Sequence, residues 1–137
     1  MKSIIFFTTT LCLLSTIQAK GLSFMQTQKL ALITQHCLAA TDVPIENLLK
    51  FGDHQYDDND DEVKEYVHCW CKAAGIIDDD GEFRTNRIRK TLNDLLDKET
   101  ANKILSECLI KAESPVETAW KYSKCVHQYL PAHYPQY

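Results

Sequence analysis

The sequence predicts an all-α fold, a compact domain built from six short helices. Apolar residues recur at the helical period in six separate stretches, and no strand signal appears. The four glycines and four prolines stand at the ends of these stretches, where they punctuate helices. Five cysteines follow residue 20, which suggests that disulfide bridges tie the helices together.

The first 19 residues are predicted to form a secretory signal peptide. A short basic start precedes an uncharged apolar run from Ile4 to Ile17, and cleavage is expected after Ala19. The run is too short for a membrane anchor, which needs roughly twenty apolar residues. We therefore expect a secreted, extracellular protein with one domain over residues 20–137.

Acidic residues outnumber basic ones by 19 to 15, which argues against two classes of partner. Nucleic acids and anionic membrane surfaces both attract proteins with a basic surface. The acids gather at residues 57–62 and 78–82, where solvated loops and helix starts explain them best. No nucleic-acid partner is therefore expected.

Capping residues delimit the first two predicted helices. The first covers residues 22–40, with Ser23 as a candidate N-cap. Asp42 is expected to cap the second, which has Pro44 in its first turn and ends at Gly52. Their inward residues are expected to be Leu30, Ile33, Cys37, Leu38, Leu48, Leu49 and Phe51.

The third helix is expected to organise the others around it. Asp60 or Asn59 caps it, and its acidic first turn suits the positive end of the helix dipole. Gly75 stops it in the left-handed position that follows many helices. Its buried stripe consists of Val63, Val67, Trp70 and Ala74.

Three more helices complete the predicted domain. They cover residues 85–96, residues 99–112, and a stretch that opens at Pro115 and stops at Pro131. Ser114 caps the last one, with proline at its first position and Glu117 in its first turn. The inward residues of the three are Ile88, Leu92, Leu95, Leu96, Ile104, Leu105, Cys108, Leu109, Val116, Ala119, Trp120, Ser123 and Val126.

The cysteines give the chain a family resemblance. Cys12 leaves with the signal, and two bridges with one free thiol is the simplest arrangement of the remaining five. Cys37 and Cys69 precede the stretch IIDDDGEF, and Cys108 and Cys125 follow it. In these features the chain resembles the insect odorant-binding protein family, of the general odorant and pheromone-binding type, over nearly all of residues 20–137.

That family has six cysteines, paired first to third, second to fifth and fourth to sixth. Cys37, Cys69, Cys108 and Cys125 match the first, third, fourth and sixth, whereas Glu65 and Val116 stand at the second and fifth. The two absent cysteines would have been partners, so one whole bridge is missing, as in the minus-C subgroup of the family. The resemblance implies the bridges Cys37–Cys69 and Cys108–Cys125.

Cys71 departs from the family pattern. It stands two residues from Cys69 and so points to a different side of the helix. A buried free thiol that behaves as a small apolar residue is one interpretation. A mixed pairing, or a homodimer linked through Cys71, is the other.

The spacing of the candidate residues matches no metal-binding or catalytic motif. The pair Cys69 and Cys71 beside His68 lacks the second pair of ligands that a structural zinc needs. A calcium loop counted back from Gly81 would begin at Ile76, whose side chain cannot ligate. The elbow Gly-x-Ser-x-Gly of serine hydrolases is absent. Neither an enzyme nor a metal or cofactor is expected.

The resemblance implies a carrier that binds small hydrophobic molecules, such as odorants or pheromones, in an apolar cavity. The competing interpretation is a secreted interaction protein, toxin- or cytokine-like, without a ligand cavity. A membrane receptor or a second copy of the chain remains open as a further partner. The candidate cavity wall consists of Leu48, Phe51, Val67, Trp70, Ala74, Ile88, Leu92, Leu109, Trp120 and Val126.

Release of the ligand on acidification is a second property that the resemblance implies. Some relatives use histidines or a C-terminal tail that covers the pocket. His127, His133 and the tail of residues 134–137 are the candidates in this chain. Histidine fits this role because its charge changes near pH 6.5.

Overall fold

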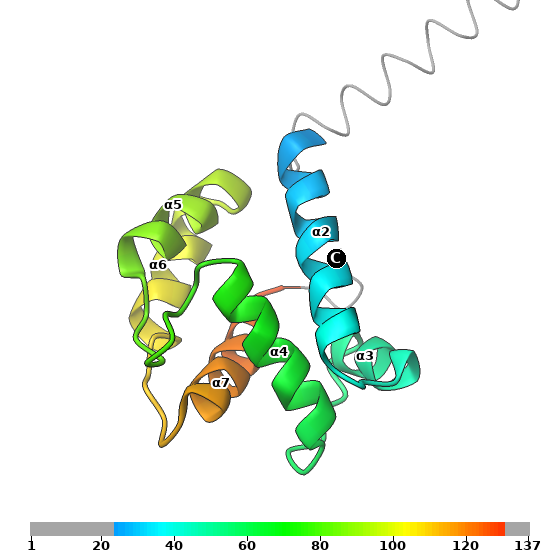
Figure 1. Ribbon diagram of the computed structural model, residues 1–137. Coiled ribbons are helices and arrows are strands. Elements are labelled where there is room, and N and C mark those ends of the chain that lie inside the picture. The colour runs from blue at the N-terminus through cyan, green and yellow to red at the C-terminus, as the bar shows by residue number, and fades with distance from the viewer. Residues whose placement is uncertain (1–23, 131–137) are drawn as a thin grey trace, which may run out of the picture.

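The computed structural model describes residues 24–130 and confirms the all-α prediction. These residues form no strand, only a single bridge between Ile77 and Phe83 (Figure 1). The expected signal peptide and the end of the tail lie outside the described residues. The described part contains six helices, α2 (Phe24–Ala40), α3 (Ile45–Gly52), α4 (Asp61–Ala73), α5 (Thr85–Leu95), α6 (Lys98–Glu107) and α7 (Pro115–His127).

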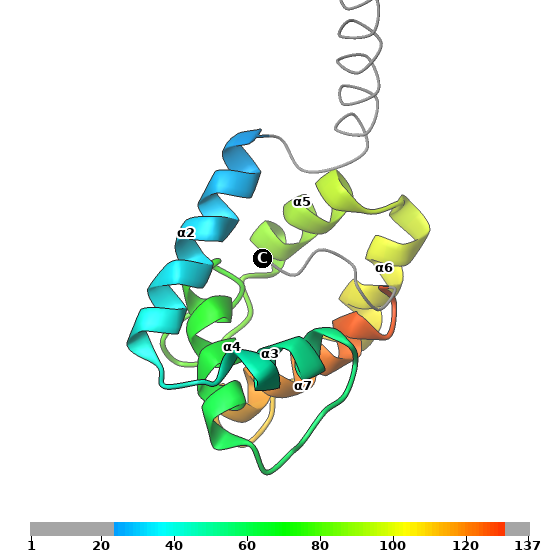
Figure 2. The same ribbon diagram turned by 90° about the vertical axis from the view of Figure 1, so that its right-hand side faces the viewer.

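Helix α4 lies at the centre of the packing, as the sequence predicts. It packs mainly against α7 and α2, which flank it in Figure 1, while α5 packs against α6. In Figure 2 the helices form a ring, with α2 opposite α5 and α6, and with α3, α4 and α7 along the base. No helix in residues 24–130 is long and apolar enough to cross a lipid bilayer.

Side-chain caps fix three helix starts. Asp60 accepts a hydrogen bond from the Val63 amide (3.1 Å), and Ser114 accepts one from the Glu117 amide (3.2 Å). Both caps agree with the sequence prediction, and Asp97 caps α6 in the same way. Each cap satisfies an amide that has no partner inside its helix, which stabilises a helix by about 1 kcal/mol.

Two disulfide bridges hold the ring of helices together. Cys37–Cys69 joins α2 to α4, and Cys108–Cys125 joins the end of α6 to α7. Both are the bridges that the resemblance implies. Each could stabilise the fold by about 3–4 kcal/mol, because it closes a loop of the unfolded chain. Cys71 is free and buried.

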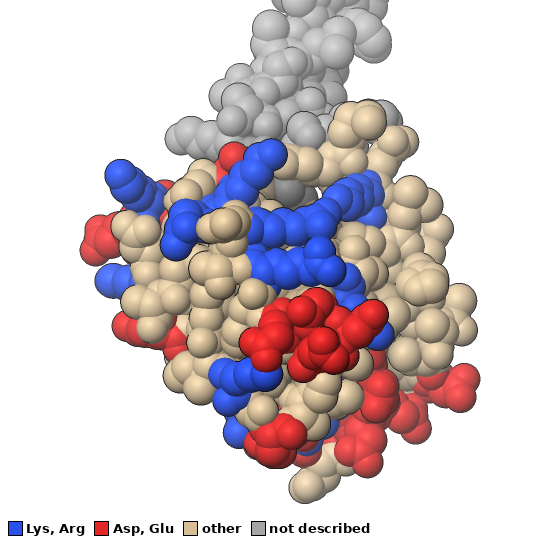
Figure 3. Space-filling view, turned by 60° about the vertical axis from the view of Figure 1, so that its left-hand side comes forward, with Lys and Arg blue, Asp and Glu red and all other residues tan. Residues whose placement is uncertain are grey.

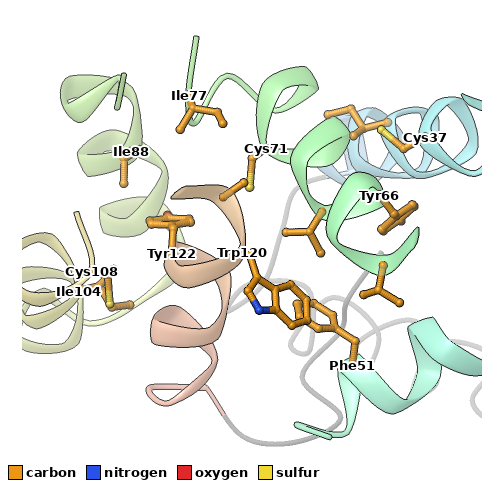
Figure 4. Packing of buried hydrophobic residues seen from close by; sticks show 14 of the residues in the cluster. Cys37, Phe51, Tyr66, Cys71, Ile77, Ile88, Ile104, Cys108, Trp120 and Tyr122 are labelled. Carbon is orange, nitrogen blue, oxygen red and sulfur yellow. The ribbon is translucent and has the colours of Figure 1, made fainter. Parts of the chain in front are cut away.

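The buried core draws on every helix of the ring. Trp120, Ile77, Ile104, Thr118 and Cys37 are almost fully inaccessible to water. Figure 4 shows the Trp120 indole beside the Phe51 ring, with the two ring centres 5.4 Å apart. A large aromatic anchor of this kind stabilises the contact between α7 and α3.

Helix α3 starts later than the sequence predicts. Pro44, not Asp42, is the residue before the first turn, and its carbonyl accepts hydrogen bonds from the amides of Asn47 and Leu48. Pro44 itself has an extended ψ of 138° and is not helical. Val43 precedes this proline, whose ring makes the helical conformation unfavourable for the residue before it. The helix therefore cannot begin at Val43.

Helices α6 and α7 both end earlier than predicted. Helix α6 stops at Glu107 because Cys108 is bridged to α7, and the following backbone is held by a hydrogen bond from the Ala112 amide to Thr118 Oγ1 (2.9 Å). The expectation that α6 continues to residue 112 is therefore wrong. Helix α7 ends at His127, before Pro131 is reached.

Candidate functional site

A cavity of about 710 Å³ lies inside the ring, between α2, α3, α4, α5 and α7. Its volume falls within the roughly 300–1,000 Å³ that small-molecule sites occupy. Buried apolar side chains from each of these five helices form its interior, namely Ile33, Phe51, Val67, Ile88, Leu92 and Tyr122. The arrangement offers apolar contact to a ligand from all sides.

Eight of the ten residues of the candidate wall line this cavity. Seven of them come from α3, α4, α5 and α7, because the inward stripes of these helices converge on the same space. These eight are Leu48, Phe51, Val67, Trp70, Ala74, Ile88, Leu92 and Val126. Ala74 lies directly after α4, and its small side chain leaves room in the wall.

Trp120 lies outside the cavity lining. Its indole N–H donates to Asp58 Oδ1 (2.7 Å), and the amine of Lys124 lies over its ring. It borders a separate small depression of about 170 Å³, which α3, the segment before α4 and the start of α4 also line. Trp120 therefore belongs to the core that holds α7 against α3 and α4.

Leu109 also lies outside the cavity lining. It is half-buried beyond the end of α6, in the extended segment that leads to α7. The sequence places it on an inward helical stripe, but the helix ends two residues earlier. Its side chain covers the core instead of facing the cavity.

Helix α2 contributes lining residues that the candidate wall omits. Leu30, Ile33, Thr34 and Leu38 face the cavity, although the sequence identifies only an apolar side of this helix. Tyr122, Ser123 and His127 on α7 line it as well. The helical period shows which face is inward, but not whether that face meets another side chain or an open space.

The side chains of Tyr66, Tyr122 and Cys71 in the cavity lining stay uncharged at neutral pH. Burial raises the pKa of the Tyr66 and Tyr122 hydroxyls. Burial also raises the pKa of the Cys71 thiol to about 12, and its Sγ lies 3.7 Å from Ser123 Oγ. A charged group would lose its hydration among these walls, so the interior favours apolar ligand atoms.

His127 is the buried polar residue at one end of the cavity. Its ring lies 4.6 Å from that of Phe51, and its Nδ1 is 3.0 Å from the Tyr56 hydroxyl. His54 stacks on it at 5.2 Å, with a positive φ of 62°. His133 and the rest of the tail, the other candidates for acid-dependent release, lie outside the described residues.

No group of three metal-ligating side chains occurs within residues 24–130. Cys69 is bridged to Cys37, and Cys71 is enclosed in the cavity wall.

A helical domain closed by two bridges around an apolar cavity belongs to the class of small-molecule-binding folds. Comparison with known proteins gives the family: the PBP/GOBP family profile matches residues 21–129, and the chain belongs to that family. The solved structure of a fatty acid binding protein from the oral disk of the blowfly Phormia regina has a similar fold. The TM-score is 0.63 at 20% identity, over 79% of this chain and 94% of that one.

Curated relatives match smaller parts of the sequence. The B2 and B1 proteins of Tenebrio molitor are each 29% identical to the chain over 70 residues, which is 50% of this chain. The chain spans about half the length of these two relatives, 55% and 54% respectively. The odorant-binding protein 10 of Aedes aegypti is 23% identical over 95 residues, 68% of this chain and 67% of that protein.

Proposed function

We propose that this protein is a secreted carrier that binds small hydrophobic molecules non-covalently in the cavity. The single observation behind the proposal is the apolar cavity of about 710 Å³, in which Tyr66 and Cys71 are uncharged at neutral pH. Membership of the PBP/GOBP family supports it, as do relatives named as odorant-binding and fatty acid binding proteins. Residues 1–19 are the proposed secretion signal, and residues 20–137 the secreted domain.

The eight lining residues of the candidate wall are the proposed ligand contacts. Burial of apolar ligand surface supplies the affinity, at roughly 25 cal/mol per Å². The bridges keep the ring of helices open, so the cavity does not have to form anew for each ligand. Binding of a ligand in this cavity requires neither a receptor nor a second copy of the chain.

The absence of the family's second-to-fifth disulfide bridge affects the range of ligands that the cavity can accept. Glu65 on α4 and Val116 on α7 occupy the positions of the absent cysteine pair. We assign the chain on this ground to the minus-C subgroup. Helices α4 and α7 both line the cavity, so the absence of a covalent link between them favours a wall that adapts to several ligands.

A homologous series of alkanols tests the carrier proposal. The full chain is expressed in insect cells and purified, and each alcohol is titrated against a bound fluorescent apolar probe. Each added methylene contributes about 0.8 kcal/mol when buried, so the affinity should rise roughly fourfold per carbon until the cavity is full. The recovery of the protein from the medium tests secretion at the same time.

A matched pair of variants locates the binding. Ala74→Leu adds bulk to the cavity wall and should shorten the best alkanol by about two carbons. Ala73→Leu places the same bulk on the neighbouring exposed position and should change nothing. If the folded protein displaced no probe with any alkanol, the carrier proposal would fail. The interaction protein without a ligand cavity is not favoured, because the cavity is present.

A further inference from the structure

Two basic side chains stand at the edge of an otherwise apolar cavity. Lys29 on α2 and Arg87 on α5 line it, together with the deep apolar residues. We propose that the preferred ligand is an amphiphile with an anionic head group, a medium- or long-chain carboxylate, whose head is bound by Arg87 and Lys29. This inference rests on the proposed carrier function and names the class of ligand for the same site.

The position of Arg87 depends on the glycine beside it. Gly75 has φ +76°, and a Cβ atom added to it would stand 2.7 Å from the guanidinium. The guanidinium therefore lies over bare backbone at the end of α4, where any other residue would displace it. This packing holds the charge of Arg87 at the cavity edge while its side chain stays exposed to water.

Neither cation of the cavity edge has a partner among the described residues, whereas most lysines do. Lys29 and Arg87 make no hydrogen bond or ion pair within residues 24–130. Six lysines each lie within 4 Å of an acid, namely Lys64, Lys72, Lys103, Lys111, Lys121 and Lys124. The chain is rich in acids, yet it leaves these two charges available for a ligand.

The acid of the cavity lining is contributed by a different part of the ring. Asp53 follows α3, and α3 makes no contact with α5, which contributes Arg87. Figures 1 and 2 both show these two helices apart. Arg87 forms no ion pair within residues 24–130, so Asp53 does not bind the guanidinium.

Basic side chains gather in one band on the surface of the molecule. Figure 3 shows Lys and Arg side chains in a band across the face on which α5 and α6 come forward, with the acids gathered below it. Such a band raises the local concentration of anions near the cavity edge. It offers an approach path for a carboxylate despite the net negative charge of the chain.

The interior and the edge of the cavity suit different ends of one molecule. An alkyl chain fits the uncharged interior, where a carboxylate would lose its hydration. At the edge, the carboxylate keeps part of its water and gains charge-assisted hydrogen bonds from the guanidinium and the amine. Because both cations are exposed, we expect a modest gain, about three- to tenfold in affinity over a neutral head.

Dodecanoate and 1-dodecanol test the inference as a matched pair. Both are titrated into the purified protein at pH 7.4 with the same displaced probe. Dodecanoate should bind about three- to tenfold tighter, and 0.5 M NaCl should reduce the difference. Arg87→Gln combined with Lys29→Gln should bring the ratio of the two affinities close to one, through a loss of affinity for dodecanoate. Arg87→Lys in place of Arg87→Gln should restore part of the ratio.

Two control variants separate the cavity edge from the general charge of the surface. Arg84→Gln and Arg89→Gln remove exposed cations of the same region that do not line the cavity, and they should leave the ratio unchanged. Equal affinity of the wild-type protein for both ligands would overturn the inference and leave the carrier proposal intact. An equal loss in the control variants would overturn the assignment to Arg87 and Lys29. Binding of neither ligand would overturn both proposals.

Discussion

The thiol of Cys71 is enclosed by the cavity wall and by Ser123, whose Oγ lies 3.7 Å away. Its neighbour Cys69 points to another side of α4 and is bridged to Cys37. The free-thiol interpretation of Cys71 therefore agrees with the structure, whereas a mixed pairing does not. A dimer linked through this buried atom would require part of the cavity wall to open.

We predict that Cys71 reacts very slowly with thiol reagents in the native protein. Burial raises its pKa to about 12, so its thiolate fraction near pH 8 is about a thousandfold below that of an ordinary cysteine. Ellman's reagent should therefore detect one thiol per secreted chain in denaturant, and almost none over the same time without it. Cys71→Ala should show no thiol in either condition. Fast native reaction, or a disulfide-linked dimer on a non-reducing gel, would contradict the enclosed thiol.

Individual residues of the cavity wall are predictable only where the inward face of their helix borders the open space. Val67, Ile88 and Leu92 follow from the inward stripes of α4 and α5. Trp120 sits on an equally clear stripe, but its neighbours on α3 and α4 fill the space in front of it. Arg87 could not be found from periodicity, because its place depends on the backbone of Gly75 in the turn that follows α4.

At the scale of elements, a largely buried ion pair joins α4 to α7. Lys64 Nζ on α4 lies 2.6 Å from Glu117 Oε1 on α7, and the two side chains are only 11% and 25% exposed. Lys64 is next to Glu65 and Glu117 is next to Val116, the two positions at which the family resemblance implies a missing cysteine pair. The contact with Glu117 also raises the pKa of Lys64 and keeps it charged.

We predict that this ion pair contributes measurably to the packing of α4 against α7. Lys64→Met should lower the free energy of unfolding by about 1–2 kcal/mol, because it leaves Glu117 without its charged partner. Combined with Glu117→Gln in a double-mutant cycle, it should reveal a coupling of about 1 kcal/mol in urea denaturation. Lys103→Met, which breaks an exposed pair within α6, should change stability by less than about 0.5 kcal/mol. Strictly additive effects of the two substitutions would show that the pair does not connect the helices.

Helix starts are better predictable than helix ends in this chain. Asp60 and Ser114 allow the starts of α4 and α7 to be predicted, because a cap is a local interaction between a side chain and the next turn. The end of α6 depends on Thr118, which lies in the following helix and binds the backbone at Ala112. Such a contact between elements leaves no periodic trace in the sequence.

At the scale of the whole molecule, stability depends on groups whose protonation differs between the folded and unfolded chain. Burial and the nearby Lys72 lower the pKa of His68 below its ordinary 6.5. Its Nε2 is buried without a hydrogen-bond partner among the described atoms. Hydrogen bonds from Lys124 and Trp120 lower the pKa of Asp58 below 3.8. The two groups act in separate ranges of pH.

We predict that the free energy of unfolding falls in two steps on acidification. As the pH drops through 6.5, the unfolded chain takes up a proton at His68 before the folded chain does, so the fold loses stability. Near pH 3.8 the unfolded chain likewise protonates Asp58 first, which removes the stability that the charged carboxylate provides. Urea denaturation between pH 8 and pH 3 measures both steps. His68→Gln should flatten only the first step and Asp58→Asn only the second. An unchanged slope between pH 7.5 and pH 5.5 in His68→Gln would contradict the assignment of the first step to His68.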